Sequence, residues 1–231
     1  MTSILLGDYI SNPVQDDPLA LTPYGRLEQA ELADFLAHWD ELHREALARI
    51  PERIHATAYI HPHSIVGDDV IIGAHAKVWE FSSVRKGAVL GAGVSVGWGC
   101  EVTGTFLGEG TILGHRIGLG RSIVGARAHL SASLMAAAIS IWSDHMSRPE
   151  REIVMRAPAG IYRCRTSQFG ALIGDGVQTG NNISLGPGVA IGRNCRISSG
   201  VTLAGRVIEE GSVISAPHVA DVHVRRRRRR S

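Results

Sequence analysis

Two side chains near the middle of the sequence are of types that carry out proton transfer and anion binding: His115 in "LGHRIG" and Arg85 in "VRKG". An imidazole titrates near neutral pH, so it can take a proton from an attacking amine or hydroxyl. A guanidinium presents a planar fork of N–H donors that matches phosphate oxygens. Either residue could equally be a solvated surface side chain, so the fold around them decides their meaning.

Cysteine and histidine raise the further questions of nucleophilic catalysis and metal binding. The chain has three cysteines, an odd number without a visible secretory leader, which argues against a disulfide framework. Cys164 could be exposed, but no base lies beside it in sequence, and we do not expect a nucleophile there. Histidines gather in one early stretch: His55, His61, His63 and His75.

Length and composition predict a soluble protein with an aliphatic core, built as one good-sized domain or as one domain with a small appendage. The 231 residues include 44% hydrophobic residues, only 5% aromatic residues and 27 glycines. No apolar run is long enough to span a membrane, and "MTSILLGDYI" does not resemble a signal peptide, so we expect a cytoplasmic protein. The net charge is +2, but Arg225 to Arg230 form one run, so the rest of the chain is mildly acidic. This distribution differs from that of a generally basic nucleic-acid binder.

A six-residue period must position these side chains. Every sixth residue from Ile54 to Val102 is Val, Ile or Leu, and the pattern returns from Ile173 to Leu203 after register slips near Leu107 and Val124. A step of six turns an α-helix by about 240°, whereas it is a multiple of the two-residue period of a strand. The fourth residue after each aliphatic is usually small or branched, Cys100 and Cys195 included, which places both on the inward face. The period therefore predicts short strands stacked coil on coil around an aliphatic column.

The remaining segments divide the chain further. Residues 24 to 50 show helical spacing of apolar residues between Pro23 and Pro51, and we expect an amphipathic helix that caps the first coil. We assign residues 1–53 to an N-terminal segment with this capping helix and residues 54–216 to the repeat domain. The pattern stops over 135–170, which predicts a long inserted loop. Residues 217–231 form a basic tail.

The repeat is typical of hexapeptide-repeat proteins, and that resemblance implies a mainly β, left-handed parallel β-helix. Three stretches narrow it: "SSVRKGAVLGAGVSVGWGCEVTGTFLG", "LGEGTILGHRIGLGRSIVGARAHLSAS" and "FGALIGDGVQTGNNISLGPGVAIG". They resemble the acetyltransferase domain of bifunctional glucosamine-phosphate sugar nucleotidyltransferases, over roughly residues 54–216. The nucleotidyltransferase half of that family has no counterpart in this sequence.

The resemblance implies roles for particular residues. His115 falls where the family has its general base, and Arg85 matches an arginine that holds the sugar phosphate. Two acceptor-site residues are replaced, a lysine by Thr103 and an asparagine by His129, and we expect both to line a reshaped acceptor pocket. A family tyrosine is replaced by Gly118 and a second lysine by Gly170. The lost lysines remove positive charge, which leaves the identity of the acceptor open.

On the donor side, Asn181 and Ser199 match positions that contact coenzyme A in the family, while an expected arginine is Ala216. The resemblance implies acyl-CoA as co-substrate, no tightly bound cofactor, and a homotrimer with sites between subunits. Hexapeptide proteins of the carbonic anhydrase type bind zinc through histidines, two of them paired five residues apart. No such pair occurs at His115 or His129, so we expect no metal.

The sequence thus favours an acyltransferase that moves a small acyl group from coenzyme A to an amine or hydroxyl of a small molecule, possibly an amino sugar. Two alternatives remain open. One is a non-catalytic trimeric binding module. The other is an acyltransferase with a carrier-bound donor, either acyl carrier protein or a charged tRNA, recruited through Arg225–Arg230.

Overall fold

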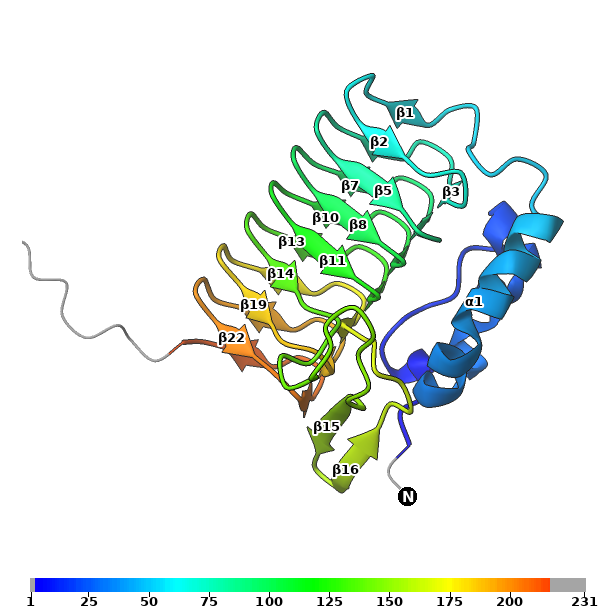
Figure 1. Cartoon of the computed structure of the whole chain (residues 1–231). Helices are drawn as coiled ribbons and strands as arrows, with labels where there is room; N and C mark the ends of the chain where they lie inside the picture. The colour runs from blue at the N-terminus through cyan, green and yellow to red at the C-terminus, as the bar shows by residue number, and fades with distance from the viewer. Residues whose placement is uncertain (1–2, 217–231) are drawn as a thin grey trace, which may run out of the picture.

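Short strands joined by tight corners stack coil on coil into a three-sided prism (Figure 1). This is a computed structural model, and it describes residues 3–216, so the arginine run at 225–230 lies outside the described residues. After three strands the chain returns to the first face, one coil further along, and all neighbouring strands within the prism run parallel. The fold is a left-handed parallel β-helix, which confirms the predicted fold class.

Each face of the prism is one sheet. In spatial order, the first face holds β1 (Tyr59–Ile60), β4 (Lys77–Val78), β7 (Ser95–Val96), β10 (Ile112–Leu113), β13 (His129–Leu130), β18 (Gln178–Thr179), β21 (Arg196–Ile197) and β24 (Val213–Ile214). The second holds β2 (Ile65–Val66), β5 (Ser83–Arg85), β8 (Glu101–Thr103), β11 (Gly118–Gly120), β14 (Met135–Ala136), β19 (Ser184–Leu185) and β22 (Thr202–Leu203). The third holds β3 (Ile71–Ile72), β6 (Val89–Leu90), β9 (Phe106–Leu107), β12 (Ile123–Val124), β17 (Ala171–Ile173), β20 (Val189–Ile191) and β23 (Arg206–Ile208). We call the corner between the first and second faces the first edge, and the corner between the second and third faces the second edge.

The predicted aliphatic column fills the prism. The residues at the six-residue period and those four positions later form one continuous buried cluster, and Ile54, Ile60 and Val66 at the open end are partly buried. Small polar residues replace some inward aliphatics and bond to the backbone. The Ser82 hydroxyl donates to the Gly97 carbonyl at 2.6 Å and accepts from the Cys100 amide at 3.0 Å. Within residues 3–216, the inward hydroxyls of Thr105, Thr111 and Ser122 also donate to backbone carbonyls, so they add no unpaired polar group to the column.

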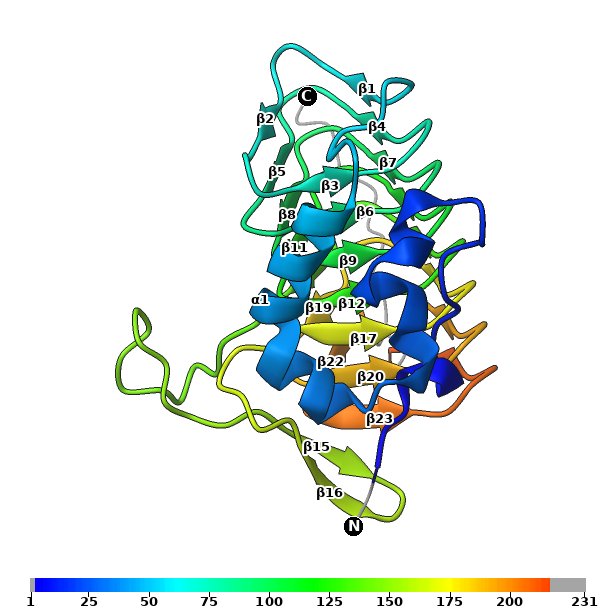
Figure 2. The ribbon, with the colours of Figure 1, turned by 90° about the vertical axis from the view of Figure 1, so that its right-hand side faces the viewer.

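The third face differs from the other two because its outward residues are also apolar. In these strands the column residue is preceded by a second buried hydrophobic residue: Ile71, Val89, Phe106, Ile123, Leu172 and Ala190. The N-terminal segment covers them, through the 3-10 helices η1 (Leu6–Asp8), η2 (Pro18–Leu21) and η3 (Pro23–Gln29) and the helix α1 (Leu32–Arg49) (Figure 2). The amphipathic helix is confirmed, but it begins at residue 32, and the residues from 23 to 29 are 3-10.

The predicted position of this helix is wrong. It does not cap the first coil. It lies along the third face, across several coils, because that face presents a long apolar surface and the open end presents only one coil (Figure 2). Such a surface buries more apolar area than the end of the column could.

The inserted loop contains a hairpin, β15 (Val154–Ala157) and β16 (Gly160–Arg163), which extends the third face by pairing with β23. The Tyr162 hydroxyl donates to Glu31 at 2.5 Å and accepts from the Ala33 amide at 2.7 Å. Glu31 is also the N-cap of α1. The insertion is thus partly built into the domain. Within residues 3–216, no helix has the length and apolarity needed to cross a membrane.

Phe106 tests how strongly the N-terminal segment is held. Its ring is 1% exposed and stacks on Tyr24, with centroids 5.4 Å apart. We expect Phe106→Ala to lower the free energy of unfolding by about 3–5 kcal/mol, measured by denaturant titration. Val213→Ala, at a side chain 76% exposed, is the control and should change it by less than about 0.5 kcal/mol. Equal effects for the two variants would contradict the packing described here.

Candidate active site

His115 stands at a tip of the first edge. It occupies the corner between β10 and β11, its side chain is exposed, and its carbonyl accepts from the Ser133 amide at 2.9 Å. The next residue, Arg116, has a φ of 53°, in the left-handed region that this sharp corner requires. The imidazole therefore projects from the prism with no partner among the described side chains, where a second molecule can reach it.

Both predicted donor residues lie on the same edge. The register of the first face places Ala132, Asn181 and Ser199 at the same corner position as His115, in successive coils. Backbone hydrogen bonds continue this row, from Asn182 to Ala132 at 3.0 Å and from Gly200 to Asn181 at 3.0 Å. The Asn181 carboxamide oxygen accepts from the Ala132 amide at 3.1 Å, and the Ser199 hydroxyl accepts from the Asn181 amide at 2.9 Å. These side chains are exposed at the corner and also hold it together.

Arg85 and Thr103 lie elsewhere, at the second edge, where β5 and β8 end. Arg85 is exposed and forms an ion pair with Glu101. The Thr103 hydroxyl oxygen is buried and finds no hydrogen-bond partner among the described residues. The width of the second face separates both residues from His115 of the same chain. One copy alone does not bring the predicted base and these predicted acceptor residues together.

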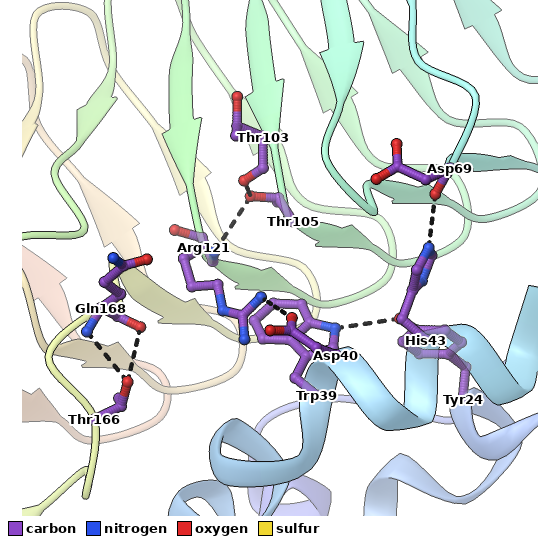
Figure 3. Close-up of polar contacts among 11 residues, drawn as sticks. Tyr24, Trp39, Asp40, His43, Asp69, Thr103, Thr105, Arg121, Thr166 and Gln168 are labelled. Atoms are coloured by element: carbon purple, nitrogen blue, oxygen red, sulfur yellow. Dashed lines mark hydrogen bonds and ion pairs between the residues drawn. The ribbon is translucent and has the colours of Figure 1, made fainter. Parts of the chain in front are cut away.

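A polar network joins the second edge to α1 (Figure 3). The Arg121 amide donates to the Thr103 carbonyl at 2.9 Å, and the Arg121 guanidinium pairs with Asp40 at 2.6 Å and lies 4.7 Å from the Trp39 ring centroid. His43 links the Tyr24 hydroxyl, at 2.8 Å, to the Asp69 carbonyl, at 2.7 Å. Lys86 and Arg121 line a hollow of about 340 Å³ between the helix and this edge. Lys86 follows Arg85 in the sequence, whereas the charge of Arg121 is balanced by Asp40.

His129 is on neither edge. It lies in β13 on the outer side of the first face, exposed, between Ile112 of β10 and Gln178 of β18. The coil that carries it is the one after His115. Its place in an acceptor pocket stays a prediction.

The sequence interpretation missed a row of exposed aromatic rings on the first face and first edge. Trp79 contacts Tyr59 at 5.4 Å between centroids, Phe81 contacts His63 at 5.8 Å, and Trp98 contacts Phe81 at 6.3 Å. Such separations are typical of interacting rings. Trp98 ends the row and occupies the corner position of His115 in the preceding coil. Writing the sequence coil by coil would have shown that these corners carry rings.

The structure corrects one expectation about cysteine. Cys164, which could have been exposed, is buried, as are Cys100 and Cys195. Burial, with a smaller effect of Glu152 and Glu31, raises the pKa of Cys164 to about 12. A thiolate nucleophile is therefore not available there at neutral pH. Across residues 3–216, no three His, Cys, Asp or Glu side chains gather closely enough to hold a metal ion.

Comparison with known proteins gives one family match and distant likenesses. The model of the family described as "Bacterial transferase hexapeptide (six repeats)" matches residues 170–205, so this part of the repeat is similar to that family. The carnitine operon protein CaiE of Escherichia fergusonii is 27% identical over 138 residues, which cover 51% of this chain and 70% of that protein.

Among solved structures, PerB from Caulobacter crescentus, in complex with CoA and GDP-perosamine, is 15% identical with a TM-score of 0.27. The match covers 77% of this chain and 61% of PerB. The acetyltransferase domain of PglB from Neisseria gonorrhoeae, in complex with acetyl coenzyme A, is 17% identical with a TM-score of 0.27, over 78% of this chain and 63% of PglB. The chain thus spans about three-fifths of the length of these two solved proteins.

Burial of the thiols gives a direct test. All three cysteines should fail to react with Ellman's reagent at pH 8 in the folded protein, because the thiols are buried and their pKa values are raised. Unfolding in guanidinium should release three equivalents. One fast equivalent in the native protein, removed by Cys164→Ser, would contradict the position described for this residue.

Proposed function

We propose that the protein is an acyltransferase that moves a small acyl group from coenzyme A to an amine or hydroxyl of a small molecule. The observation that carries this proposal is the row on the first edge, where His115, Asn181 and Ser199 stand at one corner position of the same prism edge. The matched hexapeptide family is a transferase family, which supports the same class of reaction.

In this proposal His115 is the general base. The acceptor nitrogen or oxygen attacks the thioester carbonyl carbon as the imidazole takes its proton. The tetrahedral intermediate then expels the thiolate of coenzyme A, and the imidazolium returns the proton to that sulfur. The products are an amide or ester and free coenzyme A, with the histidine restored. Backbone amides at the corners are available to polarise the thioester carbonyl.

Asn181 and Ser199 would hold the donor. Neighbouring coils of a β-helix lie about 4.8 Å apart, so Ser199, three coils from His115, is roughly 14 Å away along the edge. Coenzyme A is elongated, with its thiol at one end and its nucleotide at the other. A donor laid along this edge would bring the thioester to His115 while its middle and far parts pass Asn181 and Ser199.

A second copy of the chain would complete the site. Arg85 and Thr103 lie on the second edge, so they can meet His115 only if the second edge of one copy approaches the first edge of another. Three prisms with their second faces toward a common axis make this contact three times and close into a ring. We propose a homotrimer of this kind.

The composition of the second face supports this orientation. Within its strands the only charged side chains are Glu101 and Arg85, which pair with each other, and Ile65 and Met135 are 66% and 55% exposed. The first face carries exposed Lys77 and Arg196, and the N-terminal segment covers the third. The second face is the one of the three that can be buried at least cost in charge desolvation.

The base assignment is tested by His115→Ala. Loss of the proton acceptor should lower kcat for thiol release from acetyl-CoA by a factor on the order of 10² to 10⁴, while coenzyme A binding, measured by calorimetry, stays unchanged. His75→Ala is the matched control, because His75 is an exposed corner histidine on a different edge, and it should keep full turnover. Full turnover by the His115 variant would refute the assignment.

The shared site is tested by mixing subunits. His115→Ala and Arg85→Ala trimers should each be weak, but co-expressed chains should regain activity, because some interfaces then join an intact His115 to an intact Arg85. Random mixing restores about one quarter of the sites when the interface is heterologous. If both residues act within one chain, mixing restores none, and the arrangement is wrong.

A further inference from the structure

The first edge is chemically different on the two sides of His115. At the same corner position, the coils after His115 carry Ala132, Asn181 and Ser199, and the coil before it carries Trp98. The residues after His115 are small or polar. Before His115, Trp98 is followed at the same corner position by Glu80, and the exposed rings of Trp79 and Phe81 stand on either side of Glu80. In the proposed function, coenzyme A lies along the side of His115 that carries Asn181 and Ser199. The acceptor must then approach His115 from the other side, where Trp98 stands.

Trp98 is held rigidly next to the proposed base. Its carbonyl accepts from the Arg116 amide at 2.9 Å, so the Trp98 and His115 corners are in direct backbone contact, one coil apart. Phe81 packs against the indole at an interplanar angle of 82°, which supports one side of it. The indole remains 42% exposed. Gly97 and Gly99 flank it, and neither adds a side chain that would cover the ring.

Glycine is required at one of these flanking positions for a separate reason. A Cβ on Gly97 would overlap the carbonyl oxygen of Gly114 in the next coil. Because Gly97 has no side chain, the coil that carries Trp98 can lie close to the coil that carries His115. The missing side chain also leaves the approach to the indole open.

We propose that Trp98 is the residue that binds the acceptor, by stacking against a ring that carries the amine or hydroxyl to be acylated. The inference rests on the proposed function and adds the substrate class: an acceptor with a rigid ring, either a sugar ring or an aromatic ring. An indole face binds both, through contact with the apolar face of a sugar or by aromatic stacking.

The trimer proposed above is consistent with this placement. Rotation about the axis keeps each residue at its height along the prism. Arg85 of the partner subunit would arrive at the height of Phe81, and Thr103 of the partner subunit at the height of Trp98, because these pairs occupy the same coils. Both are on the aromatic side of His115. An acceptor stacked on Trp98 could therefore place an anionic group toward Arg85 of the partner subunit.

The experiment compares Trp98→Ala, Trp98→Phe and, as control, Trp142→Ala, which removes an indole that is 70% exposed on the inserted loop. Acceptors are glucosamine (a sugar ring), tyramine (an aromatic ring) and ethanolamine (no ring), with acetyl-CoA as donor. We expect Trp98→Ala to raise KM for the preferred ring acceptor about tenfold, with little change in kcat or in KM for acetyl-CoA. Trp98→Phe should restore most of the affinity for the ring acceptor. Trp142→Ala should leave KM for every acceptor unchanged, and Trp98→Ala should leave KM for ethanolamine unchanged.

A binding measurement keeps the test independent of turnover. Glucosamine and tyramine are titrated against His115→Ala protein with coenzyme A present and followed by ligand-observed NMR. The proposal is supported if the binding signal of a ring compound disappears in the double variant His115→Ala/Trp98→Ala and remains in His115→Ala/Trp142→Ala. This result would hold even if the base assignment fails. An unchanged signal, absence of binding by both ring compounds, or an effect of Trp98→Ala on trimer formation alone, seen by sedimentation, overturns it.

Discussion

The spacing between coils governs the rest of the structure. Parallel backbone hydrogen bonds set each coil about 4.8 Å from the next, and the aliphatic column inside prevents any coil from shifting sideways. A corner residue therefore has a fixed edge and a fixed height. His115, Asn181 and Ser199 are far apart in sequence, but this constraint places them in one row.

The three faces differ in what covers them because their outward residues differ. Apolar outward residues on the third face require a cover, which the N-terminal segment and the β15–β16 hairpin provide. The second face is nearly free of net charge, and the first carries exposed cations and rings. Since the inward residues are much alike on all faces, the outward residues decide which side stays available for substrates and partners.

The repeat could be predicted because a six-residue period in Val, Ile and Leu is directly visible, and the column from Val70 to Leu203 follows from it. The position of α1 could not be predicted from this period. The period identifies the inward column residues, but α1 packs on the outward residues that directly precede them on the third face. Residues such as Ile71 and Phe106, each just before a column residue on the third face, carry that information. For the candidate site, family resemblance pointed to His115 and Arg85, but only the three-dimensional register shows that they lie on different edges. The aromatic row escaped notice because its members are about one coil apart in sequence.

The anchoring of the N-terminal segment has a consequence for how the chain is made. The Ser11 hydroxyl donates to Asp175 at 2.6 Å across 164 residues of sequence, and Tyr162 bonds to Glu31 across 131. Coils of a solenoid can form one after another from local contacts, but these links cannot. On the ribosome, Ser11 and Glu31 can gain these partners only after residues 162–175 have been made, so the cover of the third face is completed late in translation, although Tyr24 can meet Phe106 earlier.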